Sequence, residues 1–307
     1  MDIKLLESIL KEQQIAAPAI YDCISARAVE LVGYKATYLS STALAYSFCG
    51  ISDMGIISGD EICYAASRIS DYSPLPLIVD VENAFSNNPV SVRRLISRLV
   101  KAGADAIVLD DTTDDRSMKI QTGVEIVSRE QWNQKVKEAV SIAAGTKCMV
   151  IARTFAKTGF GIEEAIERCN AAKASGADIT CIYGLKTMVE AKQVAALVKG
   201  LKMWSDFGLT DGKPDVELQE IEKLGYKLIT IHYTEKATLF GMTDFAKHNK
   251  QDGNTLYHDE HDFDGLLRER DHHTLFNFHK YWLPMEEQFN NVDAFCNSHS
   301  YGKKAKE

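Results

Sequence analysis

Short apolar runs rich in β-branched residues recur along the chain and alternate with longer amphipathic segments. The eight runs cover residues 17–22, 36–41, 77–82, 106–111, 149–154, 179–184, 201–206 and 228–233. In the intervening segments apolar residues return every three or four positions, and a Gly stands near the end, as in 88–104, 129–145 and 161–177. Strand and helix repeated in this way are typical of an α/β fold, and eight repeats predict a (β/α)₈ TIM-type barrel.

Other parts of the pattern predict how the chain is organised around such a barrel. Eight parallel strands can also lie in an open, doubly wound sheet, which is the alternative architecture. Residues 1–14 predict a helix before the first strand, 247–265 are polar and predict a loop, and 266–289 predict aromatic-rich helices. We therefore expect a barrel domain over 1–248 and a C-terminal loop and helical extension over 249–307.

Composition narrows the class of protein. The chain has 307 residues, of which 45% are hydrophobic and 25% charged, and its net charge is −8. These values fit a globular enzyme, and the acidic balance argues against a nucleic-acid partner. No apolar run reaches the length of a membrane span, and the start lacks a signal-peptide core, so we expect a cytoplasmic protein. The seven cysteines form no CxxC pair, which argues against a disulfide framework or a zinc site.

Polar side chains gather where the predicted strands end, which is where a barrel enzyme has its site. In chain order these are Ser40, Ser41, Asp80, Glu82, Asp110, Asp111, Arg153, Tyr183, Ser205, Asp206, His232 and Tyr233, and the loop after the second strand adds Asp53. Side chains two apart on a strand point to the same face, so we expect Asp80 and Glu82 to point the same way.

Crowded carboxylates on neighbouring strands predict a divalent cation. Asp80, Glu82 and Asp110 would repel one another unless a cation neutralised them, and oxygen-only ligands suit Mg²⁺ or Mn²⁺. The alternative is a solvated rim whose acids cap the following helices. Arg153 would hold the carboxylate of an anionic substrate, or else form a salt bridge to a rim acid.

Several motifs resemble one family. The run YDCISARAVELVGYKATYLSS (21–41) is similar to the opening of the phosphoenolpyruvate mutase/isocitrate lyase superfamily. GISDMG (50–55), DVENAF (80–85), LDD (109–111) and IARTFA (151–156) resemble its Gly-x-Pro-Asp-x-Gly, Asp-x-Asp, Glu-Asp and Ile-Ala-Arg-Thr-Asp-Ala motifs. The resemblance covers about residues 1–245, with the motifs in the family's order.

This resemblance implies a barrel that assembles as a homotetramer and exchanges a C-terminal helix between subunits. It implies Mg²⁺ (or Mn²⁺) bound through Asp80, with Glu82, Asp110 and Asp53 acting mainly through waters. It also implies a small α-oxo or α-hydroxy acid as substrate, and an enolate-like intermediate stabilised by metal and arginine. The expected substrate-binding residues are Tyr21, Ser40, Ser41, Arg153, Ser205 and His232.

The chain departs from the family in the loop after the fourth strand. The lyases carry Lys-x-Cys-Gly-His there, with the Cys as general acid/base, whereas this chain keeps only Lys119. KIQT (119–122) is a looser echo of the Lys-x-Asn-Ser motif of the mutases and phosphonopyruvate hydrolases. We expect Lys119, Arg153 and Tyr183 to be catalytic, with Tyr183 or His232 as the acid/base group. The alternative for Tyr183 is packing, and for His232 a structural hydrogen bond.

Other departures lie at the metal and substrate positions. Glu82 replaces an Asp and Asp110 replaces a Glu, which would be compensatory if one carboxylate lengthens as the other shortens. Phe155 replaces an Asp and Tyr183 a Glu. The expected function is a Mg²⁺-dependent C–C lyase acting on a small oxo or hydroxy (di)carboxylate. The alternatives are a P–C bond enzyme of phosphonate metabolism and a non-catalytic binding descendant.

Overall fold

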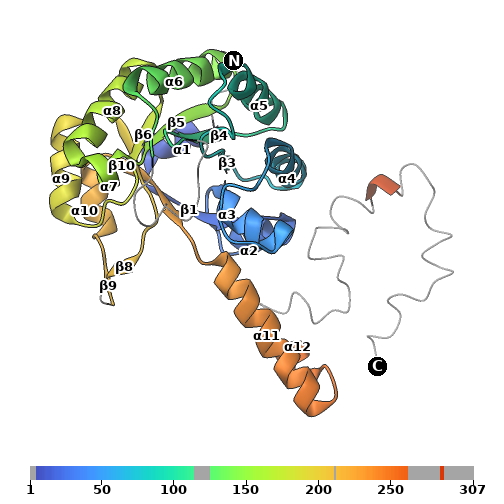
Figure 1. The fold of residues 1–307 in the computed structure, drawn as a ribbon. Coiled ribbons are helices and arrows are strands. Elements are labelled where there is room, and N and C mark those ends of the chain that lie inside the picture. The colour runs from blue at the N-terminus through green and yellow to red at the C-terminus, as the bar shows by residue number, and fades with distance from the viewer. Residues whose placement is uncertain (1–4, 114–124, 211, 262–283, 287–307) are drawn as a thin grey trace. The chain divides into compact units, whose positions relative to one another are not determined.

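The computed structural model describes residues 5–113, 125–210, 212–261 and 284–286 (Figure 1). The chain falls into two compact units, Met1–Ala237 and Thr238–Glu307. The first holds the barrel, and the predicted division after residue 248 stays a prediction. Among the described residues, no helix is both long and apolar enough to cross a membrane.

Within the described ranges, eight parallel strands form a closed barrel in the order β1-β10-β7-β6-β5-β4-β3-β2. They are β1 (Ile15–Ile20), β2 (Thr37–Leu39), β3 (Leu77–Asp80), β4 (Ala106–Asp110), β5 (Met149–Thr154), β6 (Ile179–Ile182), β7 (Leu201–Trp204) and β10 (Tyr226–Ile231). β1 bonds to both β2 and β10, so the sheet has no free edge. The predicted barrel is confirmed, and the closure excludes the open sheet.

Helices surround the barrel strands, as Figure 1 shows. They are α1 (Leu5–Glu12), α2 (Cys23–Leu31), α3 (Ser41–Leu44), the π-helix η1 (Ala45–Cys49), α4 (Gly59–Tyr72), α5 (Pro89–Lys101), α6 (Arg129–Ala143), α7 (Ala156–Phe160), α8 (Ile162–Ala174), α9 (Met188–Leu197) and α10 (Leu218–Lys223). A short antiparallel pair, β8 (Leu209–Thr210) and β9 (Lys213–Pro214), lies between β7 and α10 in the chain.

Helix starts follow from local sequence. Ser58 accepts from the N–H of Glu61, whose side chain accepts in return from Ser58, so a capping box begins α4. Ser128 does the same with Gln131 at α6. Such caps satisfy N–H groups that have no partner within the helix. They fix the points at which the loops from the barrel mouth enter the helices.

The strand residues that point into the barrel form their own apolar cluster. It includes Ala17, Ala19, Tyr38, Ile78, Ala106, Val108, Met149, Ile151, Ile179, Cys181, Met203 and Leu228, with Leu6 and Leu10 of α1 packed against them. The alternate residues, such as Val79 and Ile107, belong to the layer between sheet and helices.

The inward rows continue, two residues at a time, to the carboxyl ends of the strands. Ile78 leads to Asp80, Val108 to Asp110, and Ile151 to Arg153. The same step leads to Tyr21, Ser40, Tyr183, Ser205 and His232. The period of two therefore directs most of the predicted site residues to one end of the barrel.

Several element bounds expected from the sequence were wrong. The first strand was expected over 17–22 but is Ile15–Ile20, and the second was expected over 36–41 but is Thr37–Leu39. The third strand was expected over 77–82 but ends at Asp80, because Glu82 has φ +50 and cannot continue a strand. Strand alternation therefore does not place Glu82. The segment 247–265 was expected to be a loop, yet α11 (Thr234–Asp252) extends into it and α12 (Leu256–Glu260) follows. Stacking of Tyr257 on the rings of His248 and His261 accompanies this helical structure, which hydropathy alone did not indicate.

Candidate active site at the mouth of the barrel

Arg153 is the centre of the polar cluster at the carboxyl ends of β3, β4 and β5. Its Nη1 and Nη2 donate to the two carboxylate oxygens of Asp80 at 3.1 and 2.9 Å. Nη2 also donates to Asp110 at 3.1 Å. All three side chains are buried. Burial alone would lower the pKa of Arg153, but the two carboxylates raise it well above its usual value, so the guanidinium stays charged.

Asp80 receives two further hydrogen bonds. The Tyr38 hydroxyl donates to Oδ2 at 2.6 Å, and the N–H of Glu82 donates to Oδ1 at 3.0 Å. A carboxylate has about four lone-pair positions, and at least four donors occupy those of Asp80. Tyr38 also accepts from Arg153 Nη1 at 3.1 Å. Burial and the charge of Asp80 raise the pKa of Tyr38 well above its usual value, which keeps its hydroxyl proton in place.

The loop after β3 holds Glu82 in an unusual backbone conformation. Glu82, Ala84 and Phe85 all have positive φ, at 50°, 66° and 53°. Non-glycine residues rarely adopt such angles, and they persist where surrounding contacts fix them. Here the N–H of Asp110 donates to the Glu82 carbonyl at 2.7 Å, and Lys135 Nζ donates to the Asn83 carbonyl at 2.8 Å. The conformation of this loop therefore determines the position of the buried Glu82 carboxyl group.

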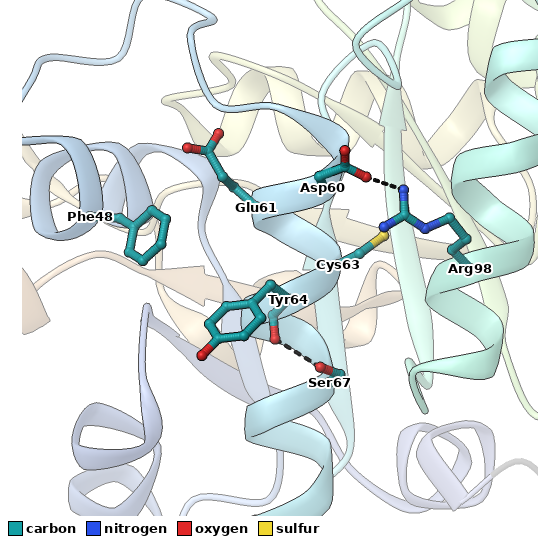
Figure 2. A pocket seen from close by; sticks show the side chains of 7 residues that line it. All are labelled: Phe48, Asp60, Glu61, Cys63, Tyr64, Ser67 and Arg98. Atoms are coloured by element: carbon teal, nitrogen blue, oxygen red, sulfur yellow. Dashed lines mark hydrogen bonds and ion pairs between the residues drawn. The ribbon is translucent and has the colours of Figure 1, made fainter.

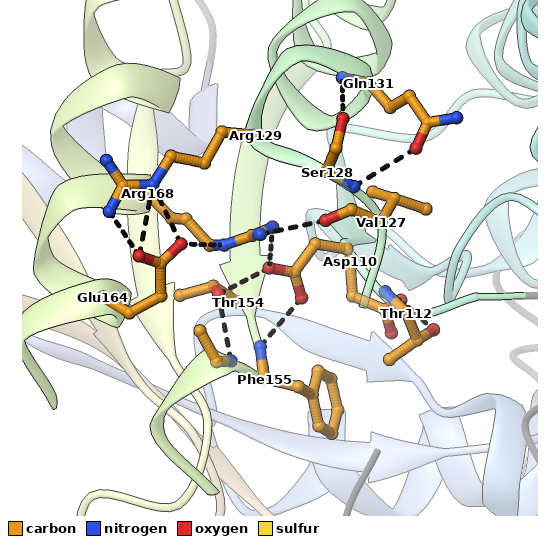
Figure 3. Close-up of polar contacts among 12 residues, drawn as sticks. Asp110, Thr112, Val127, Ser128, Arg129, Gln131, Thr154, Phe155, Glu164 and Arg168 are labelled. Atoms are coloured by element: carbon orange, nitrogen blue, oxygen red, sulfur yellow. Dashed lines mark hydrogen bonds and ion pairs between the residues drawn. The ribbon is translucent and has the colours of Figure 1, made fainter. Parts of the chain in front are cut away.

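The side chain of Asp111 points away from the mouth, and its hydrogen bonds stabilise the residues that form the mouth. Its carboxylate accepts from Thr154 Oγ1 at 2.6 Å, from the N–H of Phe155 at 2.9 Å and from Arg168 at 3.1 Å. Arg168 in turn pairs with Glu164, which also binds Arg129 (Figure 3). Desolvation raises the pKa of Asp111 above its usual value, and the three donors oppose that shift. This network fixes the ends of β4 and β5, and with them Asp110 and Arg153.

The serines after β2 are buried. Ser40 Oγ accepts from the N–H of Ala43 and caps α3. Ser41 Oγ has no hydrogen-bond partner among the described residues, and the same is true of Arg153 Nε. Buried polar atoms are usually paired, so unpaired ones at a mouth of this kind are candidates for ligand contact. Asp53 accepts from Thr42 at 2.8 Å in the loop that follows.

Aromatic rings lie beside Arg153. Phe155 stacks on Tyr183 with ring centroids 4.3 Å apart and an interplanar angle of 22°. The Arg153 guanidinium carbon lies 5.3 Å from the centre of the Phe155 ring. The two positions at which the chain departs from the family's acids are therefore in contact. Tyr183 has the packing partner that its alternative interpretation requires, and its catalytic role stays a prediction.

His232, at the end of β10, pairs with Asp206 after β7. Nδ1 of His232 lies 2.6 Å from Oδ1 of Asp206. The imidazole also packs edge-on against Tyr38, with ring centroids 5.8 Å apart. Ser205 precedes Asp206 in the chain and is buried. Tyr21 directly follows β1 and is half-buried. Lys119 lies outside the described residues.

The acids fit a divalent cation by donor chemistry. They offer carboxylate oxygens only, which Mg²⁺ and Mn²⁺ prefer. Asp80 and Asp110 share one guanidinium, so a cation would add positive charge where these carboxylates meet. Within the described ranges, no three His, Cys, Asp or Glu side chains form a ready-made metal cluster.

A separate pocket of ≈ 560 Å³ lies on the helical layer (Figure 2). It is lined by Phe48, Asp60, Glu61, Cys63, Tyr64, Ser67 and Arg98, most of them on α4. None of these residues is a predicted site residue, so we place the site at the mouth of the barrel.

Comparison with known proteins gives the family. Residues 6–247 match the phosphoenolpyruvate phosphomutase family. This chain belongs to that family. It is 31% identical to 2,3-dimethylmalate lyase of Eubacterium barkeri over 75% of this chain and 79% of that one. The resemblance to the mutase/isocitrate lyase superfamily is therefore confirmed, and the chain is an enzyme of the lyase and mutase type that acts on small carboxylates.

Solved structures agree on the fold. Oxaloacetate acetylhydrolase in complex with 3,3-difluorooxalacetate aligns with a TM-score of 0.79 and 24% identity, covering 97% of this chain and 98% of that one. Phosphonopyruvate hydrolase with oxalate and Mg²⁺ aligns with a TM-score of 0.78 and 22% identity, covering 94% and 100%.

Sequence reasoning missed Tyr38 and Arg168 as members of the polar network, and it placed Asp206 at a strand end without its partner His232. A signal existed for Tyr38, since it lies two residues before Ser40 on the inward row of β2. For Asp206 and Arg168 the sequence offered only charge, because their partners are distant in the chain.

Proposed function

We propose that this enzyme is a divalent-cation-dependent lyase. It cleaves a C–C bond next to the carbonyl or hydroxyl carbon of a small 2-oxo or 2-hydroxy dicarboxylate and forms an enolate-like intermediate. One observation carries this proposal: Arg153, Asp80 and Asp110 are buried together at the mouth, with the unpaired Ser41 hydroxyl and Arg153 Nε as further polar atoms there.

The residues of the mouth divide the task by charge. Arg153 binds the substrate carboxylate, because its charge is permanent and its Nε has no hydrogen-bond partner among the described residues. Ser41 donates a hydrogen bond to the same group. Asp80, Glu82 and Asp110 would hold Mg²⁺ (or Mn²⁺), with Asp53 acting through water. When bound, the cation supplies positive charge for the oxygen on which the enolate charge develops.

Names of similar proteins support the substrate class. A 2,3-dimethylmalate lyase and an oxaloacetate acetylhydrolase act on four-carbon dicarboxylates or their methylated forms, as their names state. Oxalate and Mg²⁺ occur together in a structural neighbour, and oxalate has the shape and charge of an enolate of pyruvate type. The cytoplasmic location and the homotetramer stay predictions.

Thermal unfolding with Mg²⁺ and oxalate tests the proposal. We expect oxalate to raise the Tm only when Mg²⁺ is present, since a ligand stabilises the state that binds it. Asp80→Ala should abolish the rise. Asp105→Ala is the matched control, because Asp105 is a buried acid at the opposite end of β4 that binds the N–H of Leu77.

The control should lower the starting Tm and keep the oxalate response. A rise with oxalate that survives in Asp80→Ala would disprove the metal assignment. A panel of oxo-acids, hydroxy-acids and phosphonates, read by product mass, then identifies the bond. Release of phosphate or rearrangement of a phosphonate in that panel would favour the P–C alternative.

A further inference from the structure

The pair formed by Asp206 and His232 lies at the same mouth, and the proposed function assigns it no role. From the sequence, His232 was expected to bind substrate or to act as the acid/base group. The two residues follow neighbouring strands, β7 and β10, and are joined by a 2.6 Å contact between Oδ1 and Nδ1. Their side chains are 43% and 32% exposed, respectively, so a ligand and solvent can both reach them. Within the described part of the chain, Nε2 of His232 has no hydrogen-bond partner.

The backbone holds Asp206 in position. Its φ is +56, a left-handed conformation that Asp adopts at some cost. The N–H of Asp206 donates to the hydroxyl of the buried Thr230 at 3.0 Å, and the N–H of Phe207 donates to the Thr230 carbonyl at 2.9 Å. Thr230 lies on β10 two residues before His232. The same strand therefore positions the acid and carries the imidazole, so their relative orientation is set before any ligand binds.

Tyr38 connects this pair to the binding groups. Its ring meets the His232 ring edge-on at 82°, and its hydroxyl binds Asp80 and Arg153. One aromatic side chain therefore separates the imidazole from the carboxylate and guanidinium that we assign to cation and substrate.

The charges around His232 favour its protonated form. Burial by itself would lower the pKa of His232, but the hydrogen bond and charge of Asp206, with further contributions from Glu235 and Asp80, raise it above its usual value. Burial would raise the pKa of Asp206, and the contact with His232 together with the charge of Arg153 lowers it instead. Among the described residues, Tyr38 also faces the imidazole, and it stays neutral because its pKa is raised well above its usual value.

We infer that His232 is the general acid/base of this enzyme and that Asp206 is its positioning residue. The inference rests on the proposed function. Nε2 delivers its proton to C3 of the enolate: the N–H bond breaks, the C2=C3 electron pair forms the new C–H bond, and the C2 carbonyl returns. Imidazolium becomes imidazole, and solvent restores the proton through the exposed part of the ring. This supplies the proton donor that the missing loop Cys would provide in the lyases.

Exchange of the methyl protons of pyruvate in D₂O with Mg²⁺, followed by ¹H NMR, tests the inference without C–C cleavage. Neutral Nε2 removes a methyl proton and returns deuterium. His232→Gln should slow exchange by about 100-fold or more, since general acid/base groups contribute that much. It should retain the rise in Tm with oxalate and Mg²⁺. Tyr226→Phe, at the opposite end of β10, is the control and should exchange as the wild type does.

Asp206→Asn tests the positioning role by its pH profile. The exchange rate of the wild type should rise with pH through the pKa of His232, and Asp206→Asn should move that rise to lower pH. The imidazole ¹⁵N shifts of His232 should report the same displacement. If Asp206→Asn lowers the exchange rate but leaves the midpoint of the pH profile unchanged, the role of Asp206 is merely structural. That result would overturn its assignment as a positioning residue.

The other outcomes separate this inference from the proposed function. Exchange that persists in His232→Gln and is lost in Tyr183→Phe would overturn the inference and leave the enolate chemistry intact. Failure of the wild type to bind oxalate or to exchange pyruvate protons would overturn the proposed function, and the role of His232 with it.

Discussion

The guanidinium of Arg153 donates two hydrogen bonds, of 3.1 and 2.9 Å, to the carboxylate of Asp80 at the mouth of the barrel, where both side chains are buried. From the sequence, Asp80 was expected to bind a cation, and Arg153 was expected either to bind the substrate or to form a salt bridge to a rim acid, as it does here. In the structure they are partners, so each helps to hold the other in the orientation that binding needs. On the proposed function, entry of a cation and a substrate would redistribute these bonds and so couple the two binding events.

Arg153→Met should destabilise the protein strongly. It leaves Asp80 and Asp110 buried without their guanidinium, and removing one partner of a buried pair costs about 3–5 kcal/mol. Arg129→Met is the control, since Arg129 is 46% exposed in its pair with Glu164 and should cost about 1 kcal/mol or less. Urea unfolding measures both. Equal losses in the two variants would contradict a buried ion pair at Arg153.

Tyr38→Phe should cost about 1–3 kcal/mol of unfolding free energy, because a buried carboxylate loses one of its donors. Tyr226→Phe is the control: its buried hydroxyl makes only a 3.4 Å contact with the Ala191 carbonyl and should cost less than about 1 kcal/mol. Denaturant midpoints at one pH compare the variants. If Tyr38→Phe cost no more than Tyr226→Phe, the hydroxyl would not be an important partner of Asp80.

The stability difference between the wild type and Asp206→Asn should depend on pH. His232 has a raised pKa, so its stabilising contribution is complete below the unfolded value of about 6.5 and is lost as pH rises through the folded pKa. Asp206 has a lowered pKa, so its contribution is complete above about 3.9 and is lost as pH falls. The difference should be largest between these two values.

Urea unfolding of the wild type and Asp206→Asn at several pH values from about 4 to about 9 measures this difference in stability. The difference in stability should decrease at alkaline pH, because the imidazole loses its charge there and only a neutral hydrogen bond remains. A difference in stability that stays constant or increases with rising pH would show that Asp206 and His232 do not form a charged pair.

Exchanging the carboxylates of Glu82 and Asp110 tests whether their replacements compensate each other. Glu82→Asp and Asp110→Glu should each weaken Mg²⁺-dependent binding of oxalate by about 10-fold, as changes around a bound metal commonly do. The double variant should recover most of that loss, because the N–H of Asp110 bonds to the Glu82 carbonyl and neighbouring residues couple. Calorimetric titration measures the affinities, and additive losses would show that the two positions act independently.

The sequence predicted the barrel because its signal is repetitive and local. Apolar runs alternating with amphipathic segments gave all eight strands, and a period of two within them directed Asp80, Asp110 and Arg153 to one end. The end of the third strand was misplaced because nothing in DVENAF announces the positive φ of Glu82. That angle depends on bonds to Asp110 and to Lys135, residues far along the chain.

By itself, then, the sequence determined the fold class, the family and the strand ends at which Asp80, Asp110 and Arg153 lie, since periodicity and motifs depend on neighbouring residues. Tertiary structure alone decided their partners: Tyr38 and Arg153 on Asp80, Asp206 on His232, and Phe155 on Tyr183. The physical reason is that hydrogen bonds and ring contacts depend on distances of a few ångströms between separate strands. Closure of the barrel sets those distances, and no local pattern encodes them.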